Sequence, residues 1–171
     1  KKTINMKNIF ALLIGKKNSP GFPVKNVMAI KGLPSFEYGF QVAKKIGIKN
    51  IFVSTDCPKI SKIGEKYSAK LIKRPSNLAT PDSLTEDVLI HAYKEMIKST
   101  EKPSIIVLLF ANNPAISIDL VKQGIKKLTD DESYDSAFSV SKYNMFSPTR
   151  ARKLVDDKIE SFVPLNLIGK V

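Results

Sequence analysis

The hydrophobic residues of the chain fall into short runs, and stretches of helical periodicity lie between them. The runs cover residues 8–15 (NIFALLIG), 50–56 (NIFVSTD), 69–74 (AKLIKR), 105–110 (IIVLLF) and 135–141 (DSAFSVS). Runs of this length are typical of strands. The first, second and fourth are apolar at consecutive positions, as expected of parallel strands that helices cover on both faces.

Four amphipathic stretches alternate with the predicted strands. Their apolar positions are Phe36, Phe40 and Ala43; Ile60, Ile63 and Tyr67; Val88, Leu89, Ala92, Tyr93 and Met96; and Ile118, Val121, Ile125 and Leu128. Pro34 suits the first turn of the first helix, and the spacing of Ser83 and Glu86 predicts a capping box at the third. Strand–helix–strand crossovers are right-handed, so this order predicts a three-layer α/β/α sandwich with a mostly parallel sheet.

The length and apolar content of the chain suit one domain. With 171 residues, 43% of them hydrophobic, the chain can bury a single core. We expect this domain to cover residues 8–171, with short strands around a turn at Asp156 and Asp157 near its end. Because KKTIN precedes the first methionine, Met6, we assign residues 1–7 to an N-terminal extension or a remnant of cloning or upstream sequence.

The net charge of +12 points to an anionic partner. Lysine outnumbers arginine 25 to 3, and no stripe of interleaved aromatic and basic residues is visible. Since arginine is favoured for bidentate recognition of phosphate, this balance argues against a nucleic-acid surface and favours small polyanionic substrates.

Cysteine content and hydropathy indicate which cellular location, cross-links and metal sites to expect. Cys57 is the one cysteine, so neither an intrachain disulfide nor a multi-cysteine zinc site is expected. The longest apolar run, residues 105–110, is too short to cross a bilayer, and the start lacks a signal-peptide pattern. We therefore expect a cytoplasmic protein without a membrane partner. His91 has no second histidine to work with and is assigned no chemistry.

The segment that follows the first predicted strand is the first candidate for chemistry. Ligands of open α/β sheets bind beyond the carboxyl ends of the strands, and residues 14–26 (IGKKNSPGFPVKN) lie there with three lysines. This loop is neither a P-loop nor a three-glycine dinucleotide turn, which argues against an oxidoreductase, and Pro20 and Pro23 prevent a helix. Two interpretations follow from the residues alone: a solvated basic loop, or a cradle for phosphate.

Four further motifs, in order along the chain, accompany this loop. They are IFVSTD (51–56), KRPSNLATPDS (73–83), IIVLLFANNPAI (105–116) and DSAFSVS (135–141). Together with NSPGFPVKN (18–26), they resemble the signature segments of the acylneuraminate cytidylyltransferase family, the CMP-sialic acid synthetases and their relatives. The resemblance covers roughly residues 8–160 and favours the phosphate cradle, because ordered motifs are far more specific than any one of them.

The resemblance implies a nucleotide-diphospho-sugar transferase-like fold and a defined reaction. Members of the family transfer CMP from CTP to an acidic sugar, such as a sialic or legionaminic acid, and release pyrophosphate with Mg²⁺. By resemblance, Lys16 and Lys25 are the catalytic cations: Lys16 holds β- and γ-phosphate oxygens, and Lys25 lies near the α-phosphate. The implied partners are these small molecules, and a homodimer is left open.

The resemblance also assigns nucleotide-binding residues. Asn18, Ser19 and Asn26 join the two lysines at the nucleotide, Arg74 lies against the cytosine, and the segment from Thr80 to Thr85 completes the base pocket. Asn112, in the segment after the fourth predicted strand, belongs to the same set, and from the residues alone it could equally form a simple turn with Asn113. From the residues alone, Arg74 could also be a surface arginine after a strand, and helix N-capping alone would account for Asp56.

The chain departs from the family pattern at the cradle and beyond the fourth predicted strand. Lys16 replaces an arginine, Pro20 replaces a lysine, and Asn112 stands where related Kdo cytidylyltransferases have a metal-binding aspartate. The later segment of the family, with an aspartate pair, has no counterpart before Val171, so the metal ligands stay unassigned. Three interpretations of this are open: a short variant of the family, a truncated product, or part of a longer chain. Two alternatives therefore accompany the prediction: a catalytically impaired nucleotide-binding domain of this fold, and a Kdo-type cytidylyltransferase.

Overall fold

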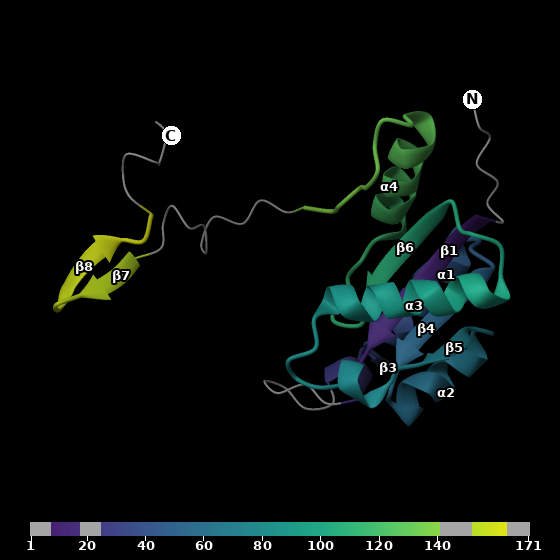
Figure 1. Ribbon diagram of the computed structural model, residues 1–171, viewed down its shortest axis with the longest axis horizontal. Helices are drawn as coiled ribbons and strands as arrows, with labels where there is room; N and C mark the ends of the chain where they lie inside the picture. The colour runs from purple at the N-terminus through teal and green to yellow at the C-terminus, as the bar shows by residue number, and fades with distance from the viewer. Residues whose placement is uncertain (1–7, 18–24, 141–151, 164–171) are drawn as a thin grey trace. The chain divides into compact units, whose positions relative to one another are not determined.

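The computed structural model describes residues 8–17, 25–140 and 152–163. The chain divides into two compact units, residues 1–137 and 138–171. The first unit contains a four-stranded parallel sheet and its helices, and the second contains a β-hairpin (Figure 1). No helix among the described residues is long and apolar enough to cross a membrane.

The sheet consists of four of the five predicted strands. They are β1 (Ile9–Gly15), β4 (Asn50–Thr55), β5 (Lys70–Lys73) and β6 (Ile105–Phe110), in the spatial order β5-β4-β1-β6. All neighbouring pairs are parallel, as the continuous apolar runs predict. The prediction of a strand at 135–141 is wrong over its described part: residues 135–140 pair with no other strand, and Phe138 is 84% exposed.

The four predicted helices are present, together with several shorter elements. The helices are α1 (Glu37–Ile46), α2 (Pro58–Lys66), α3 (Thr85–Ser99) and α4 (Ile118–Asp130). The shorter elements are the 3₁₀ turns η2 (Lys25–Val27) and η3 (Ser76–Leu78) and the two-residue strands β2 (Ala29–Ile30) and β3 (Leu33–Pro34).

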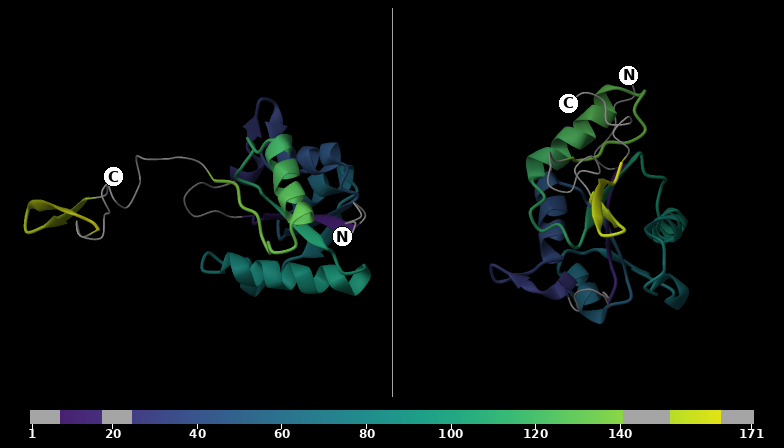
Figure 2. Two further views of the ribbon diagram at one scale, coloured as in Figure 1. Left: turned by 90° about the horizontal axis from the view of Figure 1, so that it is seen from above. Right: turned by 90° about the vertical axis from the view of Figure 1, so that its left-hand side faces the viewer.

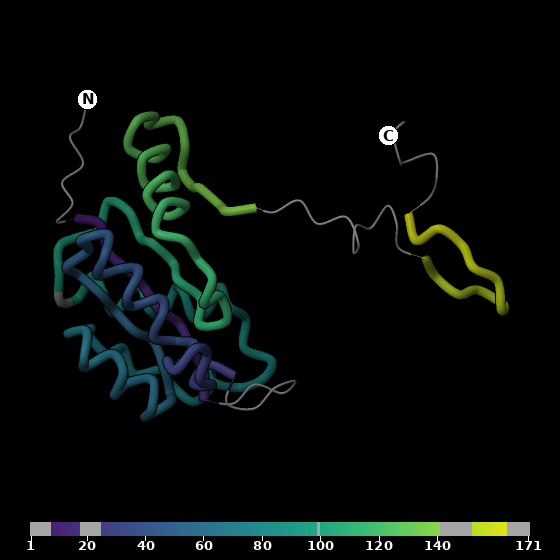
Figure 3. The backbone as a smooth tube through the Cα atoms, turned by 180° about the vertical axis from the view of Figure 1, so that it is seen from behind, coloured from purple at the N-terminus to yellow at the C-terminus, as the bar shows by residue number. Residues whose placement is uncertain are grey.

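Alternate residues of the central strand β1 enter two separate hydrophobic clusters. Ile9, Ala11 and Leu13 join the cluster under α1, α2 and α4, whereas Phe10 and Leu12 join the cluster under α3. Figures 1 and 2 show α3 crossing one face of the sheet, and Figure 3 looks onto the face that the other three helices cover. The predicted three-layer α/β/α architecture is therefore confirmed.

The start of α1 differs from the sequence prediction. Pro34 lies in β3 and pairs with Ala29, and the helix begins three residues later at Glu37. The backbone N–H groups of Ser35 and Phe36 donate back to carbonyls of the preceding segment, so these residues extend the small hairpin and do not enter the helix. This connection fixes η2 against the start of α1.

The second unit contains the hairpin of β7 (Arg152–Val155) and β8 (Lys158–Ser161). Asp156 and Asp157 both have positive φ, at 50° and 60°, which is the conformation of a type I′ turn. A cross-strand ion pair joins Lys153 to Glu160 at 3.3 Å. The predicted turn between short strands is confirmed.

A partly buried contact between α1 and the end of α2 makes the stability of the fold depend on pH in the alkaline range. The Tyr67 hydroxyl donates to Glu37 Oε1 at 3.0 Å, and its ring stacks on Phe40 at 5.1 Å. Burial first, and the carboxylate of Glu37 second, raise the pKa of Tyr67 above its usual value. The folded state therefore favours the protonated phenol, and this stabilisation is present below the ordinary pKa and is lost as pH rises through the raised one.

We expect the Tyr67→Phe variant to be less stable than the native chain at neutral pH, and this difference to shrink above about pH 10. Denaturant unfolding of both proteins across the alkaline range measures it, because the shared titration of the other tyrosines and lysines cancels in the comparison. Two parallel stability profiles would show that the Tyr67 phenol titrates as it does in the unfolded chain.

Candidate functional site

A pocket lies beyond the carboxyl ends of β1 and β6. The chain order places β4 and β5 on one side of β1 and β6 on the other, so the topological switch point of the sheet falls between β1 and β6. Open α/β sheets bind ligands at this point, because loops leave in opposite directions there. The pocket has a volume of about 200 Å³, enough to enclose part of a nucleotide-sized molecule.

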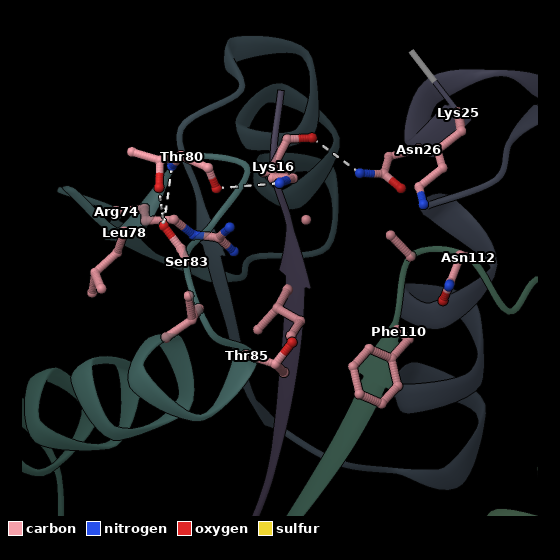
Figure 4. A pocket seen from close by; sticks show the side chains of 14 residues that line it. Lys16, Lys25, Asn26, Arg74, Leu78, Thr80, Ser83, Thr85, Phe110 and Asn112 are labelled. Atoms are coloured by element: carbon pink, nitrogen blue, oxygen red, sulfur yellow. Dashed lines mark hydrogen bonds between the residues drawn. The ribbon is translucent and has the colours of Figure 1, made fainter. Parts of the chain in front are cut away.

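Fourteen residues from four parts of the chain line the pocket (Figure 4). They are Ile14, Gly15, Lys16, Lys25, Asn26, Arg74, Leu78, Thr80, Ser83, Thr85, Val88, Phe110, Ala111 and Asn112.

Six of the predicted site residues meet in this pocket. They are Lys16, Lys25, Asn26, Arg74, Thr85 and Asn112. The other two predicted residues, Asn18 and Ser19, lie outside the described residues. The sequence therefore identified residues that share one cavity, and the roles assigned to them stay predictions.

Lys16 connects the two sides of the pocket. Its carbonyl accepts a hydrogen bond from Asn26 Nδ2 at 3.0 Å, and its Nζ donates to the Thr80 carbonyl at 3.3 Å (Figure 4). Lys25 extends past Asn26 on the side of Asn112. Two flexible cations thus border the opening, and both are placed to contact an anion that enters it.

Arg74 forms a buried, positively charged part of the pocket wall. The residue is 7% exposed, and its Nη2 donates to the Ser54 carbonyl at 2.9 Å. Its Nε is buried and has no hydrogen-bond partner among the described residues. Burial lowers the pKa of the guanidinium and the charge of Asp56 opposes that shift, yet an arginine stays protonated at physiological pH. Of the two interpretations of Arg74, the surface arginine is therefore wrong.

Asp56 does not cap α2. The helix begins at Pro58 behind Cys57, and no side chain caps its first turn. Asp56 Oδ1 instead accepts the backbone N–H of Lys17 at 2.8 Å, so its carboxylate holds the loop after β1. The N-cap prediction fails because the carboxylate instead accepts from the loop after β1, which is far from Asp56 in the sequence and so could not be recognised from the local sequence.

Ser83 likewise takes a different role from the predicted capping box. Its hydroxyl donates to the Asn77 carbonyl at 3.0 Å, accepts from the Thr80 backbone N–H at 3.1 Å and lies 2.8 Å from Thr80 Oγ1. α3 begins at Thr85 without a side-chain cap. Ser83 therefore closes the loop between η3 and α3, which forms one wall of the pocket.

Sequence reasoning missed the apolar part of the lining. Leu78, Val88 and Phe110 face the cavity with the polar residues. Phe110 is the last residue of β6, two residues before Asn112, so the rule that ligands bind beyond strand ends could have identified it. The leucine and valine carry no such signal, because an apolar residue on a helical stripe is usually core.

The described lining does not resemble a carboxylate metal site. No group of three or more histidine, cysteine, aspartate or glutamate residues in the described part of the chain could hold a metal ion. Asn26 and Asn112 offer amide oxygens, whereas Mg²⁺ sites in proteins are usually built from one or two carboxylates together with substrate phosphates. The described residues thus do not fit a protein-made magnesium site.

The parallel sheet, with a pocket at its switch point, defines an open α/β domain of the kind that binds ligands beyond its strand ends. Residues 15–159 match the family model for cytidylyltransferases, and the chain belongs to this family. The predicted family and fold are both confirmed.

Curated relatives resemble this chain over part of their length. N-acylneuraminate cytidylyltransferase A of Danio rerio is 26% identical over 162 residues, which are 94% of this chain and 36% of that protein. N-acylneuraminate cytidylyltransferase of Oncorhynchus mykiss is 22% identical over 86% of this chain and 33% of its own length. The chain thus spans about a third of the length of these relatives.

Solved structures show the same fold. CMP:2-keto-3-deoxy-manno-octonic acid synthetase complexed with CTP superposes with a TM-score of 0.58 at 21% identity, over 73% of this chain and 48% of that one. The 4-diphosphocytidyl-2C-methyl-D-erythritol synthase of Anaerococcus prevotii gives a TM-score of 0.52 at 18% identity, over 75% and 53%. At these identities the likeness concerns the fold.

Proposed function

We propose that this chain binds CTP and transfers CMP to an acidic sugar, with release of pyrophosphate. The observation that carries the proposal is the convergence of three cations, Lys16, Lys25 and Arg74, on one pocket at the switch point of a cytidylyltransferase-family sheet. The names of the relatives support a sialic-acid type of sugar. Mg²⁺, a homodimer and a cytoplasmic location stay predictions.

The proposed chemistry is an in-line displacement at the α-phosphorus. The anomeric hydroxyl of the sugar forms a new P–O bond and gives up its proton to the surroundings, while the bond between the α-phosphorus and the bridging oxygen breaks and pyrophosphate leaves. Negative charge accumulates on the leaving group, so the protein contributes mainly by positioning and by positive charge. Lys16 and Lys25 border the opening, where they would hold the phosphates, and Arg74 lies deeper, where it would meet the base.

Magnesium, when bound with the triphosphate, supplies further neutralisation of that charge. Since the described lining lacks carboxylates, we assign no step of the transfer to a protein-held ion.

A Kdo-type cytidylyltransferase is the second candidate. The solved neighbour that acts on 2-keto-3-deoxy-manno-octonic acid favours it. Sugar specificity separates the two, because both share the CTP half of the reaction. A third possible outcome is nucleotide binding without transfer. It corresponds to the catalytically impaired domain that the departures from the family pattern at Pro20 and Asn112 suggest.

A pyrophosphate-release assay tests the proposal. The chain is mixed with CTP, Mg²⁺ and, one at a time, a sialic, a legionaminic and a Kdo acid. We expect release with a sialic-type acid, and release with Kdo alone would select the second candidate. Absence of release with retained CTP binding would select the impaired domain, and absence of CTP binding would overturn the proposal.

Lys25→Ala provides a site-directed test of the same proposal. Loss of one charge-assisted contact to phosphate should weaken CTP binding by about tenfold or more, because such contacts contribute roughly 1.5–3 kcal/mol. Lys122→Ala is the matched control. Lys122 is exposed on α4, so this substitution removes the same charge at a position outside the pocket lining. Titration calorimetry measures the CTP affinity of both variants. Equal affinities would show that Lys25 does not contact the phosphates and belongs to a solvated surface loop.

A further inference from the structure

Both polar groups of a single peptide unit at the pocket are held by side chains from elsewhere in the fold. The peptide that joins Lys16 to Lys17 offers its carbonyl to Asn26 Nδ2, at 3.0 Å. The same unit donates its N–H to Asp56 Oδ1, at 2.8 Å. In a trans peptide these two groups point in opposite directions, so the two hydrogen bonds hold the peptide from both sides and fix the orientation of its plane.

The carboxylate reaches this peptide because of strand register. β1 and β4 are parallel neighbours, and Gly15 pairs with Thr55 at their carboxyl ends. Asp56 is the next residue after β4, and Lys16 is the next after β1, so the two loops begin side by side. A carboxylate at position 56 therefore lies close to the backbone N–H groups of the residues that follow β1, and it accepts the one of Lys17.

The amide on the other side is itself held. Asn26 is 7% exposed, and its backbone carbonyl accepts a hydrogen bond from the Phe36 backbone N–H at 3.0 Å. The preceding carbonyl, of Lys25, accepts from Ser35 Oγ at 2.7 Å. η2 is thus tied to the first residues before α1, and Asn26 meets the peptide from a fixed support.

We propose that Asp56 is a positioning residue which, together with Asn26, orients the Lys16–Lys17 peptide and so directs the Lys16 side chain over the pocket. This inference rests on the proposed function, in which Lys16 holds triphosphate oxygens. A lysine chain has several rotatable bonds, and fixing its backbone removes one source of misplacement before the ligand arrives. Asp56 is not among the residues that line the pocket, so it acts through the peptide.

A different role for Asp56 is electrostatic, because its charge acts on Arg74. Substitution by asparagine separates the two roles. Asp56→Asn keeps an oxygen that can accept the Lys17 N–H and removes the negative charge, whereas Asp56→Ala removes both. If the hydrogen bond carries the effect, asparagine restores function, and if the charge does, it cannot.

The experiment measures the binding of three probes, CTP, inorganic triphosphate and cytidine, to the native chain and to Asp56→Ala, Asp56→Asn and Lys16→Ala. Circular dichroism and thermal unfolding first establish that each variant is folded. We expect Asp56→Ala to weaken CTP and inorganic triphosphate by about tenfold, the effect of one lost hydrogen bond of a charged group, and to leave cytidine unchanged. Asp56→Asn should bind within about twofold of the native chain, because a neutral acceptor retains most of the contact.

Each other outcome overturns a defined part of the inference. Equal losses in Asp56→Ala and Asp56→Asn would assign the effect to charge near Arg74, and loss of cytidine along with the phosphates would assign it to general disorder of the pocket. Unchanged triphosphate binding in Asp56→Ala, with clear loss in Lys16→Ala, would show that Lys16 needs no held peptide. Unchanged binding in Lys16→Ala would instead contradict the phosphate role of Lys16 in the proposed function.

Discussion

Replacing Arg74 with alanine should abolish CTP binding, with an affinity at least about a hundredfold below that of the native chain. Arg74 is a buried cation with a free Nε in the pocket wall, so truncation removes a desolvated donor that no surface residue can replace. It also leaves the Ser54 carbonyl without the Nη2 contact. Titration calorimetry with CTP measures the loss.

Two further variants give this result its meaning. Arg74→Lys keeps the charge and loses the planar fork, so we expect it to recover part of the affinity only. Lys122→Ala removes an exposed cation from α4, outside the pocket lining, and should bind CTP as the native chain does. If Arg74→Ala folds and binds CTP with native affinity, the guanidinium has only a structural role and the cytosine base of CTP does not bind at Arg74.

The sheet and its helices were predictable because burial on both faces leaves a direct trace in the sequence. The consecutive apolar residues of β1 and β6 specify strands between helices, and the rule for strand ends then places the pocket. The run at 135–141 has a strand-like length but is less apolar, and it forms no strand over its described part. Composition indicates that a segment is able to form a strand, but the strand forms only if a neighbouring strand offers free backbone N–H and C=O groups.

The individual roles of polar side chains were much less predictable. Ser83 and Asp56 both fit local capping patterns, and in each case a nearby segment offers a competing hydrogen bond of similar energy. Which bond forms depends on loops that tertiary packing brings together, and no local window contains that information. Lys16 and Lys25 show the converse: their residues alone left a solvated loop and a phosphate cradle equally open, and the family resemblance favoured the cradle.

Gly15→Ala should both destabilise the fold and weaken CTP binding. A Cβ at Gly15 would lie 2.5 Å from Phe36 Cε2 and 3.0 Å from Ile60 Cδ1, and both side chains are buried at 1% exposure or less. The ring cannot retreat without opening the core, so the end of β1 has to move. Overpacking of this kind costs about 1–3 kcal/mol of unfolding free energy, and denaturant unfolding measures it.

The effect on binding follows from position, because Lys16 is the next residue and its peptide is held on both sides. A displaced strand end breaks that arrangement, so we expect CTP affinity to fall by about tenfold beyond any loss of folded protein. Gly124→Ala is the matched control: it lies within α4, its Cβ would meet Ala137 Cβ at an ordinary 3.8 Å, and alanine should stabilise the helix by up to about 1 kcal/mol. A Gly15→Ala protein that loses stability and keeps full CTP affinity would show that the cations of the pocket tolerate movement of the strand that carries them.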